Sequence, residues 1–116
     1  MTETSRFHLK TIHGPEDLEV QLLGDTLTIG RSSECDITLV KGATVSRMHA
    51  TLTKFDNQDG GQWRLMDNGS KHGTFLNGVK LREAQFVGIR GGDIITIEPF
   101  SLQVIDQEGD LQFTQT

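Results

Sequence analysis

The chain is a succession of short segments in which apolar and polar residues alternate, and this pattern restricts the fold more than any other feature of the sequence. In 6–12, Phe7 and Leu9 alternate with basic residues, as expected of a β-strand with one buried face. No segment long enough for a helix shows the i, i+3, i+4, i+7 apolar spacing of an amphipathic helix. Strands are therefore expected throughout.

Similar segments occupy 18–23, 26–30, 36–39, 49–55, 62–67, 74–81, 84–89, 93–98 and 101–106. Each is bounded by Gly, Asn, Asp or Pro, residues that favour turns. About ten short strands at this spacing predict an all-β sandwich or barrel. The period of two predicts core faces shared by Ala50 and Leu52, Trp63 and Leu65, Ile95 and Ile97, and Leu102 and Val104. Trp63, the only tryptophan, is expected in the core rather than on a ligand platform.

Length and composition exclude several classes of protein. The 116 residues fit one domain that buries its own core. Cys35 is the only cysteine, so an internal disulfide is excluded and a free thiol in a reducing compartment is favoured. One thiol and four histidines give no zinc-type cluster. The sequence has neither an apolar run of roughly 20 residues nor a secretory signal, so an intracellular protein is expected.

The net charge of −5 argues against a general binder of nucleic acid or acidic membranes, which presents a basic surface. A small anion site remains compatible with this charge, because a few converging donors outweigh distant charges that are screened by salt. The loops of the chain carry residues suited to such a site.

The loop 30–36 begins with Gly30 and Arg31 at the end of a predicted strand. Glycine permits a backbone conformation closed to β-branched residues. The Arg31 guanidinium offers a planar set of donors that suits phosphate or carboxylate. The alternative is a surface arginine in a weak ion pair with Glu34 or Asp36.

The segment 43–50 places Ser46, Arg47 and His49 just before a strand. A serine hydroxyl and neighbouring backbone N–H groups can form an anion nest. The alternative is a local serine turn in which His49 holds the loop through a side-chain-to-backbone hydrogen bond. A third hypothesis makes His49 the general base of a hydrolase with Ser46, but no orienting acid lies nearby in the sequence.

The segment 69–78, GSKHGTFLNG, is rich in glycine but matches neither a Walker loop nor a dinucleotide-binding fingerprint. Its Asn77-Gly78 pair, between two short runs that alternate, predicts a type I′ hairpin turn. Ser70, Lys71 and His72 remain in a loop before that hairpin. A last loop, 88–93, carries a Gly-Gly-Asp turn signal, and its arginine is expected to be solvated.

Five motifs follow one another at characteristic distances: Gly-Arg at 30–31, Asp-Ile-x-Leu at 36–39, Val-Ser-Arg-x-His-Ala at 45–50, Leu-x-Asp-x-Gly-Ser-x-x-Gly-Thr-Phe-Leu-Asn-Gly at 65–78 and Gly-Asp-x-Ile at 92–95. Together they resemble the forkhead-associated (FHA) domain, over residues 6 to about 106. The resemblance implies a two-sheet β-sandwich of about eleven strands, without catalytic activity or cofactor. It also implies that loops at one end bind a phosphothreonine in a partner peptide.

The resemblance assigns roles to individual residues. Arg31 and the Ser46 hydroxyl would contact the phosphate, and Arg47 would offer its backbone N–H and its side chain. Lys71 stands where relatives often carry a serine or threonine that touches the phosphate, and would act as a point charge. Asn77 would support the loop near the peptide backbone.

Three further residues, Gly30, His49 and Gly73, are expected to hold the loops that present the binding residues. One position departs from the family. His72 stands where relatives most often have an asparagine that grips the peptide main chain, so the register of the peptide is open. A protonated imidazole beside the phosphate would strengthen binding below about pH 6.5.

The implied function is a signalling scaffold or adaptor, in DNA-damage response or kinase signalling, with a phosphothreonine-containing protein as partner and no direct contact with nucleic acid or membrane. The alternative is an interaction module of the same fold that does not need phosphate.

We expect tails at 1–5 and 107–116 around a domain at 6–106, the second tail linking to the rest of a longer protein. The location would be nuclear in a eukaryote and cytoplasmic in a bacterium. Thr114 precedes Gln115, so a phosphorylated tail docking into a neighbouring copy would make a homodimer.

Overall fold

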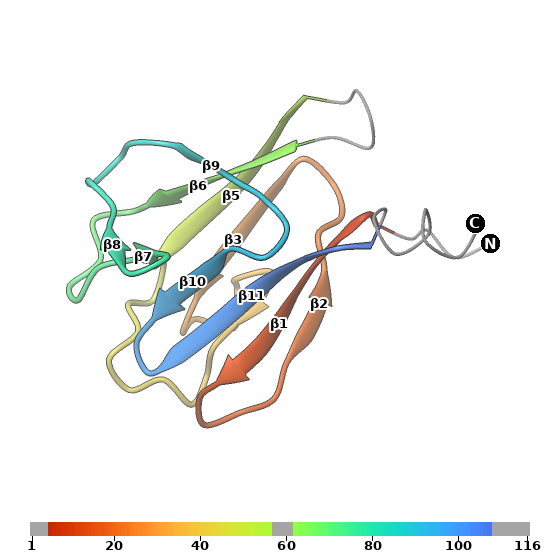
Figure 1. The fold of residues 1–116 in the computed structure, drawn as a ribbon. Coiled ribbons are helices and arrows are strands. Elements are labelled where there is room, and N and C mark those ends of the chain that lie inside the picture. The colour runs from red at the N-terminus through yellow and green to blue at the C-terminus, as the bar shows by residue number, and fades with distance from the viewer. Residues whose placement is uncertain (1–4, 57–61, 108–116) are drawn as a thin grey trace.

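The computed structural model describes residues 5–56 and 62–107, which fold into two packed β-sheets (Figure 1). Strand order is β2-β1-β11-β10-β7-β8 in one sheet and β4-β3-β5-β6-β9 in the other. The strands are β1 (Phe7–His13), β2 (Glu19–Gln21), β3 (Thr26–Gly30), β4 (Ile37–Thr38), β5 (Ala50–Asp56), β6 (Gln62–Asp67), β7 (Phe75–Leu76), β8 (Val79–Lys80), β9 (Val87–Ile89), β10 (Ile94–Ile97) and β11 (Phe100–Asp106). This confirms the predicted all-β sandwich of about eleven strands.

The hairpin that joins β7 to β8 is the predicted two-residue turn. Leu76 pairs with Val79, so only Asn77 and Gly78 lie between the strands. Their φ angles are 51° and 84°, and two positive values in succession define a type I′ turn. The remaining strand pairs are antiparallel except β3 with β4, which run parallel.

The core lies between the two sheets and is made by the residues that alternation predicted. The four predicted pairs on strands β5, β6, β10 and β11 are all buried, and Trp63 is 2% exposed. Burying one such aliphatic side chain stabilises the fold by roughly 1.5–3 kcal/mol. The apolar residues of each strand therefore determine which face of the strand is buried. The loops at the strand ends are not part of this core, so their residues can form a binding site.

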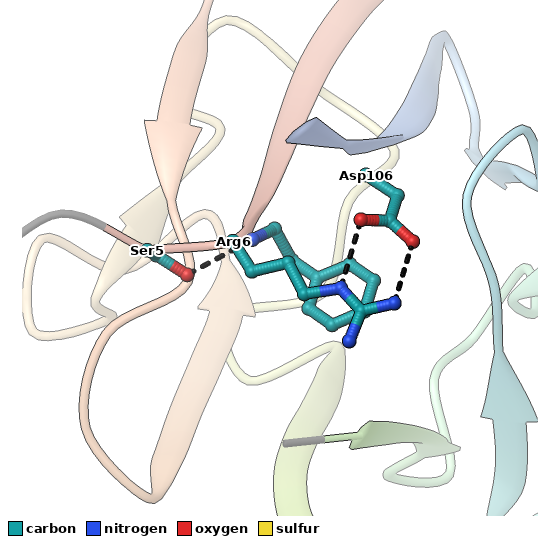
Figure 2. Close-up of polar contacts among 4 residues, drawn as sticks. Ser5, Arg6 and Asp106 are labelled. Atoms are coloured by element: carbon teal, nitrogen blue, oxygen red, sulfur yellow. Dashed lines mark hydrogen bonds and ion pairs between the residues drawn. The ribbon is translucent and has the colours of Figure 1, made fainter. Parts of the chain in front are cut away.

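An ion pair between Arg6 and Asp106 links the beginning of β1 to the end of β11 (Figure 2). Arg6 donates from Nε to Oδ1 of Asp106 at 2.9 Å and from a terminal amino group to Oδ2 at 3.0 Å. The guanidinium also lies 5.0 Å from the centre of the Phe7 ring. The loops with the predicted site residues lie at the other end of the sandwich, at the lower left of Figure 1. Over the described ranges, no helix is long and apolar enough to cross a membrane.

Candidate functional site

Two loops that are separate in the sequence lie side by side at one end of the sandwich. The Arg31 N–H donates to the Ser46 carbonyl at 3.0 Å. One residue further on, the Ser32 N–H donates to the Arg47 carbonyl at 3.2 Å. These two backbone bonds fix the loop after β3 against the loop before β5. These bonds therefore bring Arg31 and Ser46 together.

The Arg31 side chain is exposed, but a hydrogen bond fixes its orientation. Its Nε donates to the carbonyl of Val45 at 3.1 Å. The two terminal amino groups make no hydrogen bond or ion pair to any residue that the structure describes. The alternative, an ion pair with Glu34 or Asp36, is not formed among the residues that the structure describes, and the Asp36 carboxylate instead accepts from the backbone N–H and hydroxyl of Thr28. The guanidinium keeps donors for an external anion.

Ser46 joins three loops through three different groups. Its carbonyl accepts from Arg31, its N–H donates to Nδ1 of His49 at 3.1 Å, and its Oγ accepts from the Lys71 N–H at 3.0 Å. Because Oγ acts as an acceptor from Lys71, the hydroxyl proton remains available for a further acceptor. The hydroxyl is thus held at a fixed place, and its proton has no acceptor among the residues that the structure describes.

Gly30 is required by close packing. The Arg47 carbonyl accepts from both Ser32 and the Cys35 thiol, and it lies directly over the glycine. A Cβ placed on Gly30 would meet that carbonyl oxygen at 2.1 Å. The sequence-based reason, a special backbone conformation, is wrong, because Gly30 belongs to strand β3 and is not among the glycines of positive φ. The Arg47 N–H has no partner within the described chain, and its side chain is exposed.

His49 is buried, with 1% of its surface exposed, and both ring nitrogens are occupied. Nδ1 accepts from the Ser46 N–H, which leaves Nε2 as the donor to the Gly73 carbonyl at 2.9 Å. Burial lowers the pKa of His49 more than the bond to Gly73 raises it. The lone pair that a general base needs is turned to a backbone N–H rather than to the Ser46 hydroxyl.

Asp67, the last residue of β6, holds the loop 68–74 in place by accepting hydrogen bonds from it. Its Oδ1 accepts from the Ser70 hydroxyl and the Thr74 hydroxyl, each at 2.6 Å. Its Oδ2 accepts from the N–H groups of Gly69 and Ser70 at 3.0 and 3.1 Å. Burial alone would raise the pKa of Asp67, but these hydrogen bonds together lower it below its ordinary value. A charged carboxylate thus anchors the loop that carries Lys71 and His72.

Gly73 links this loop to His49. Its N–H donates to the Ser70 hydroxyl at 2.9 Å, and its carbonyl accepts from His49. Its φ is +91°, a conformation that suits glycine, and a Cβ there would meet Cε of Lys80 at 2.8 Å. The exposed side chains of Lys71 and His72 occupy the tip of the loop.

Asn77 lies in the hairpin turn, and its amide is engaged within the domain. Nδ2 donates to Asp93 at 3.0 Å, and Oδ1 accepts from the Ile94 N–H at 2.9 Å. These bonds tie the β7–β8 hairpin to the turn before β10. The structure therefore places Asn77 as a brace between two turns.

The site and its scaffold correspond to a known family. The family profile described as FHA domain matches residues 27–98. This chain is an FHA domain. The match includes the loops of Arg31 and Ser46 and the loop anchored by Asp67.

Curated relatives share this FHA domain within much longer chains. Nibrin of Danio rerio is 30% identical, covering 83% of this chain and 13% of its own. An FHA domain-containing protein of Arabidopsis thaliana is also 30% identical, covering 67% of this chain and 19% of its own. The chain thus spans less than a fifth of the length of these relatives.

Solved structures share the fold of this FHA domain. The FHA domain of CT664 from Chlamydia trachomatis superposes with a TM-score of 0.75 at 25% identity, over 88% of this chain and 98% of the other. The N-terminal FHA domain of Rad53p from S. cerevisiae, solved with a phosphothreonine peptide, gives 0.75 at 23% identity, over 91% and 97%. The MEK1 FHA domain, solved with a phosphothreonine peptide of HOP1, gives 0.74 at 20% identity, over 89% and 98%.

Asp67 and Thr74 belong to the FHA motif in the sequence, but the motif alone predicts no role for either residue. The signal was present, because Asp followed by Gly-Ser is typical of a turn in which the carboxylate accepts from the backbone two and three residues on. The hydrogen bond from Thr74, which lies across the loop, had no such local signal. Its hydroxyl is fully buried against the carboxylate.

Proposed function

We propose that this FHA domain binds partner proteins through a phosphorylated threonine that Arg31, Ser46 and Arg47 hold. The observation that carries the proposal is a set of donors, on loops hydrogen-bonded to one another, that have no acceptor within residues 5–56 and 62–107. Arg31 offers its terminal amino groups, Ser46 its hydroxyl proton and Arg47 its backbone N–H. The three come from two loops that are hydrogen-bonded to each other and to the loop of Lys71.

Phosphate chemistry suits this arrangement. A phosphothreonine carries a charge of about −1.5 to −2 and three strong acceptor oxygens. Each mobile side chain that is frozen on binding costs about 0.5–1.5 kcal/mol, so donors that are fixed beforehand bind more tightly. A hydrogen bond to a charged group contributes roughly 1.5–3 kcal/mol, and three of them supply most of the ~8 kcal/mol behind micromolar affinity.

Two exposed residues complete the rim of the proposed site. The backbone N–H of Lys71 is used by Ser46, so its contribution to phosphate binding comes from the ammonium group. His72 offers an imidazole toward the peptide main chain or the phosphate. Asn77 contributes by bracing the hairpin, since both ends of its amide are engaged with Asp93 and Ile94.

The solved relatives support the chemical class of the partner. The FHA domains of Rad53p and MEK1 were each captured with a phosphothreonine peptide. A preference for threonine over serine requires a slot for one methyl group, which contributes about 0.8 kcal/mol by burial. We infer a signalling adaptor module at 6–106 in an intracellular protein, with tails at 1–5 and 107–116, the second of which would link to the rest of a longer protein. Thr114 of the proposed dimer lies outside the described residues.

We also infer that the domain acts by binding rather than by catalysis. A hydrolase would need a base at the Ser46 hydroxyl, and the Nδ1 lone pair of His49 accepts from the Ser46 backbone instead. The buried imidazole is held in one tautomer by Gly73. Its role in this proposal is to shape the loop that presents Ser46.

The proposal is tested with one threonine peptide in phosphorylated and unphosphorylated forms, selected from an oriented library and measured by calorimetry. Arg31→Ala should abolish measurable binding, and Ser46→Ala should nearly do so. Arg47→Ala should reduce affinity less, since it retains the backbone N–H. The matched control is Arg90→Ala, which removes an exposed arginine from the turn before β10.

Folding of each variant is checked by the fluorescence of the buried Trp63. Normal phosphopeptide binding by Arg31→Ala would show that the site is assigned wrongly. Equal affinity for the two forms of the peptide would favour the interaction module that does not need phosphate.

A further inference from the structure

A groove runs beside the proposed phosphate site, between the edges of the two sheets. It has a volume of about 360 Å³, and four of its lining residues are apolar: Leu76, Val79, Leu81 and Val87. Strand β8 is the last strand of one sheet and β9 the last strand of the other. The groove therefore occupies the open side of the sandwich, where neither sheet continues.

The groove is continuous with the loop of the proposed phosphate site. The stem of Lys80, which lines the groove, lies against Gly73, at 2.8 Å from where a Cβ of that residue would be. The Leu81 N–H donates to the Thr74 carbonyl at 2.9 Å. Lys71 of this loop donates its N–H to Ser46 at 3.0 Å, so an extended peptide bound at Ser46, advancing about 3.3 Å per residue, can follow the loop to the groove.

The opposite wall is held in place by two sets of contacts. The Ala84 N–H donates to the backbone carbonyl of Asp67 at 3.0 Å, so the residue that anchors the phosphate loop also anchors this wall. On the outer face, the Arg64 guanidinium lies between the rings of Phe55 and Phe86, at 4.5 and 5.1 Å from their centres. These contacts fix the segment just before Val87. The groove is thus formed before a ligand arrives.

The charge at the groove is basic on a domain whose net charge is −5. Lys80 and Arg82 are exposed lining residues, and their side chains make no hydrogen bond or ion pair within residues 5–56 and 62–107. Glu83, the residue after Arg82, is not a lining residue, and its carboxylate lies close to Gly69. Val79, one of the apolar lining residues, is 67% exposed, which is high for an apolar side chain.

The geometry points to a second contact with the same phosphorylated partner: the groove takes an apolar side chain of that partner, flanked by carboxylates that pair with Lys80 and Arg82. The apolar lining residues favour an apolar side chain. Lys80 and Arg82, which have no ion-pair partner in the part of the chain that the structure describes, favour acidic residues beside it. This inference rests on the proposed function, because the phosphothreonine delivers the peptide to the groove.

The test uses synthetic phosphothreonine peptides in a neutral Gly-Ser background. In one series, an Asp-Leu-Asp triplet stands at successive distances on either side of the phosphothreonine, and the reference peptide has Gly-Ser-Gly instead. We expect one placement to bind about tenfold tighter than the reference, from one buried leucine and two exposed ion pairs. Val79→Thr and Arg82→Gln should each remove a large part of that gain and leave the affinity of the reference unchanged.

The control variants Ile12→Thr and Lys10→Gln remove an exposed apolar residue and an exposed cation from β1, and should keep the full gain. In wild type, the amide signals of Leu81 and Arg82 should shift in NMR spectra with the triplet peptide but not with the reference, which tests the groove without any substitution.

The second contact would be overturned if the reference peptide binds but no placement of the triplet increases affinity. It would also be overturned if the groove variants keep the increase in affinity. Either result would leave the proposed function intact. Failure of every phosphorylated peptide to bind would overturn both. The wild-type domain could also self-associate in a way that Val79→Thr abolishes and the peptides do not affect. That result would overturn the second contact and make the groove an interface between copies of this chain.

Discussion

Removing the Asp67 carboxylate should destabilise the domain more than any other single change in the loop that it anchors. The side chain is 4% exposed and accepts four hydrogen bonds, two from hydroxyl groups and two from backbone N–H groups. Asp67→Ala leaves all four donors without this acceptor. The donors differ in their access to water, and that difference sets the size of the effect.

Thr74 is fully buried, so its hydroxyl bears the full penalty of an unsatisfied group, about 1–3 kcal/mol. Ser70 is partly exposed and Gly69 exposed, so water replaces part of what these donors lose. We therefore expect Asp67→Ala to lower the free energy of unfolding by about 3–4 kcal/mol, below the sum of four separate bonds. The loop of Lys71 should loosen, and phosphopeptide affinity should fall by about tenfold, equivalent to ~1.4 kcal/mol.

Asp67→Asn provides the matched control. Its amide nitrogen can donate to the Ser70 and Thr74 hydroxyls, which are able to accept, while its oxygen still accepts from the backbone. A loss of about 1–2 kcal/mol is expected, because neutral hydrogen bonds replace charged ones.

The pH dependence separates charge from shape. Because hydrogen bonding holds the pKa of Asp67 below its ordinary value, the carboxylate stabilises the domain above about pH 4, and this stabilisation is lost as the pH falls through the lowered pKa. Asp67→Asn should lack this component of acid destabilisation.

Urea unfolding followed by the fluorescence of Trp63, the only tryptophan and a buried one, measures all of these effects. An unfolding free energy for Asp67→Ala within about 0.5 kcal/mol of wild type, the range of an ordinary surface substitution, would refute the anchoring role.

Three further predictions concern other residues. Gly30→Ala should lower both stability and phosphopeptide affinity, because its Cβ would lie 2.1 Å from a backbone carbonyl of the adjacent loop; unchanged calorimetry and unfolding curves would contradict the packing argument. Burial lowers the pKa of His49, so the unfolded chain takes up a proton first and stability should fall as pH drops below about 6.5; His49→Gln should remove that slope from unfolding measured between pH 7 and pH 5. Arg6→Met should lower the free energy of unfolding by about 1 kcal/mol, because the side chains of the Arg6–Asp106 ion pair are each about a quarter exposed. Urea unfolding checks this loss, and calorimetry should show an unchanged peptide affinity.

The fold was predictable from the sequence because its signals are local. Alternation with a period of two assigns each strand residue to a face, and Trp63, Leu65 and Ile95 are buried as that period requires. Asn77-Gly78 determined a turn type by itself, since both residues tolerate positive φ. The family motifs also selected Arg31 and Ser46, whose unused donors now support the proposed site.

Contacts between distant segments were decided only by the tertiary structure. Gly30 is needed because a carbonyl 17 residues later along the chain packs onto it, and nothing near Gly30 in the sequence indicates that carbonyl. Asp67 joins Thr74 across a loop and Ala84 in the next segment, and the groove beside β8 exists because two sheet edges meet there. The sequence by itself determined which side of each strand faces inward, because burial of apolar surface depends on local pattern. The partner of each polar group depends instead on how the strands are ordered, which only the folded chain establishes.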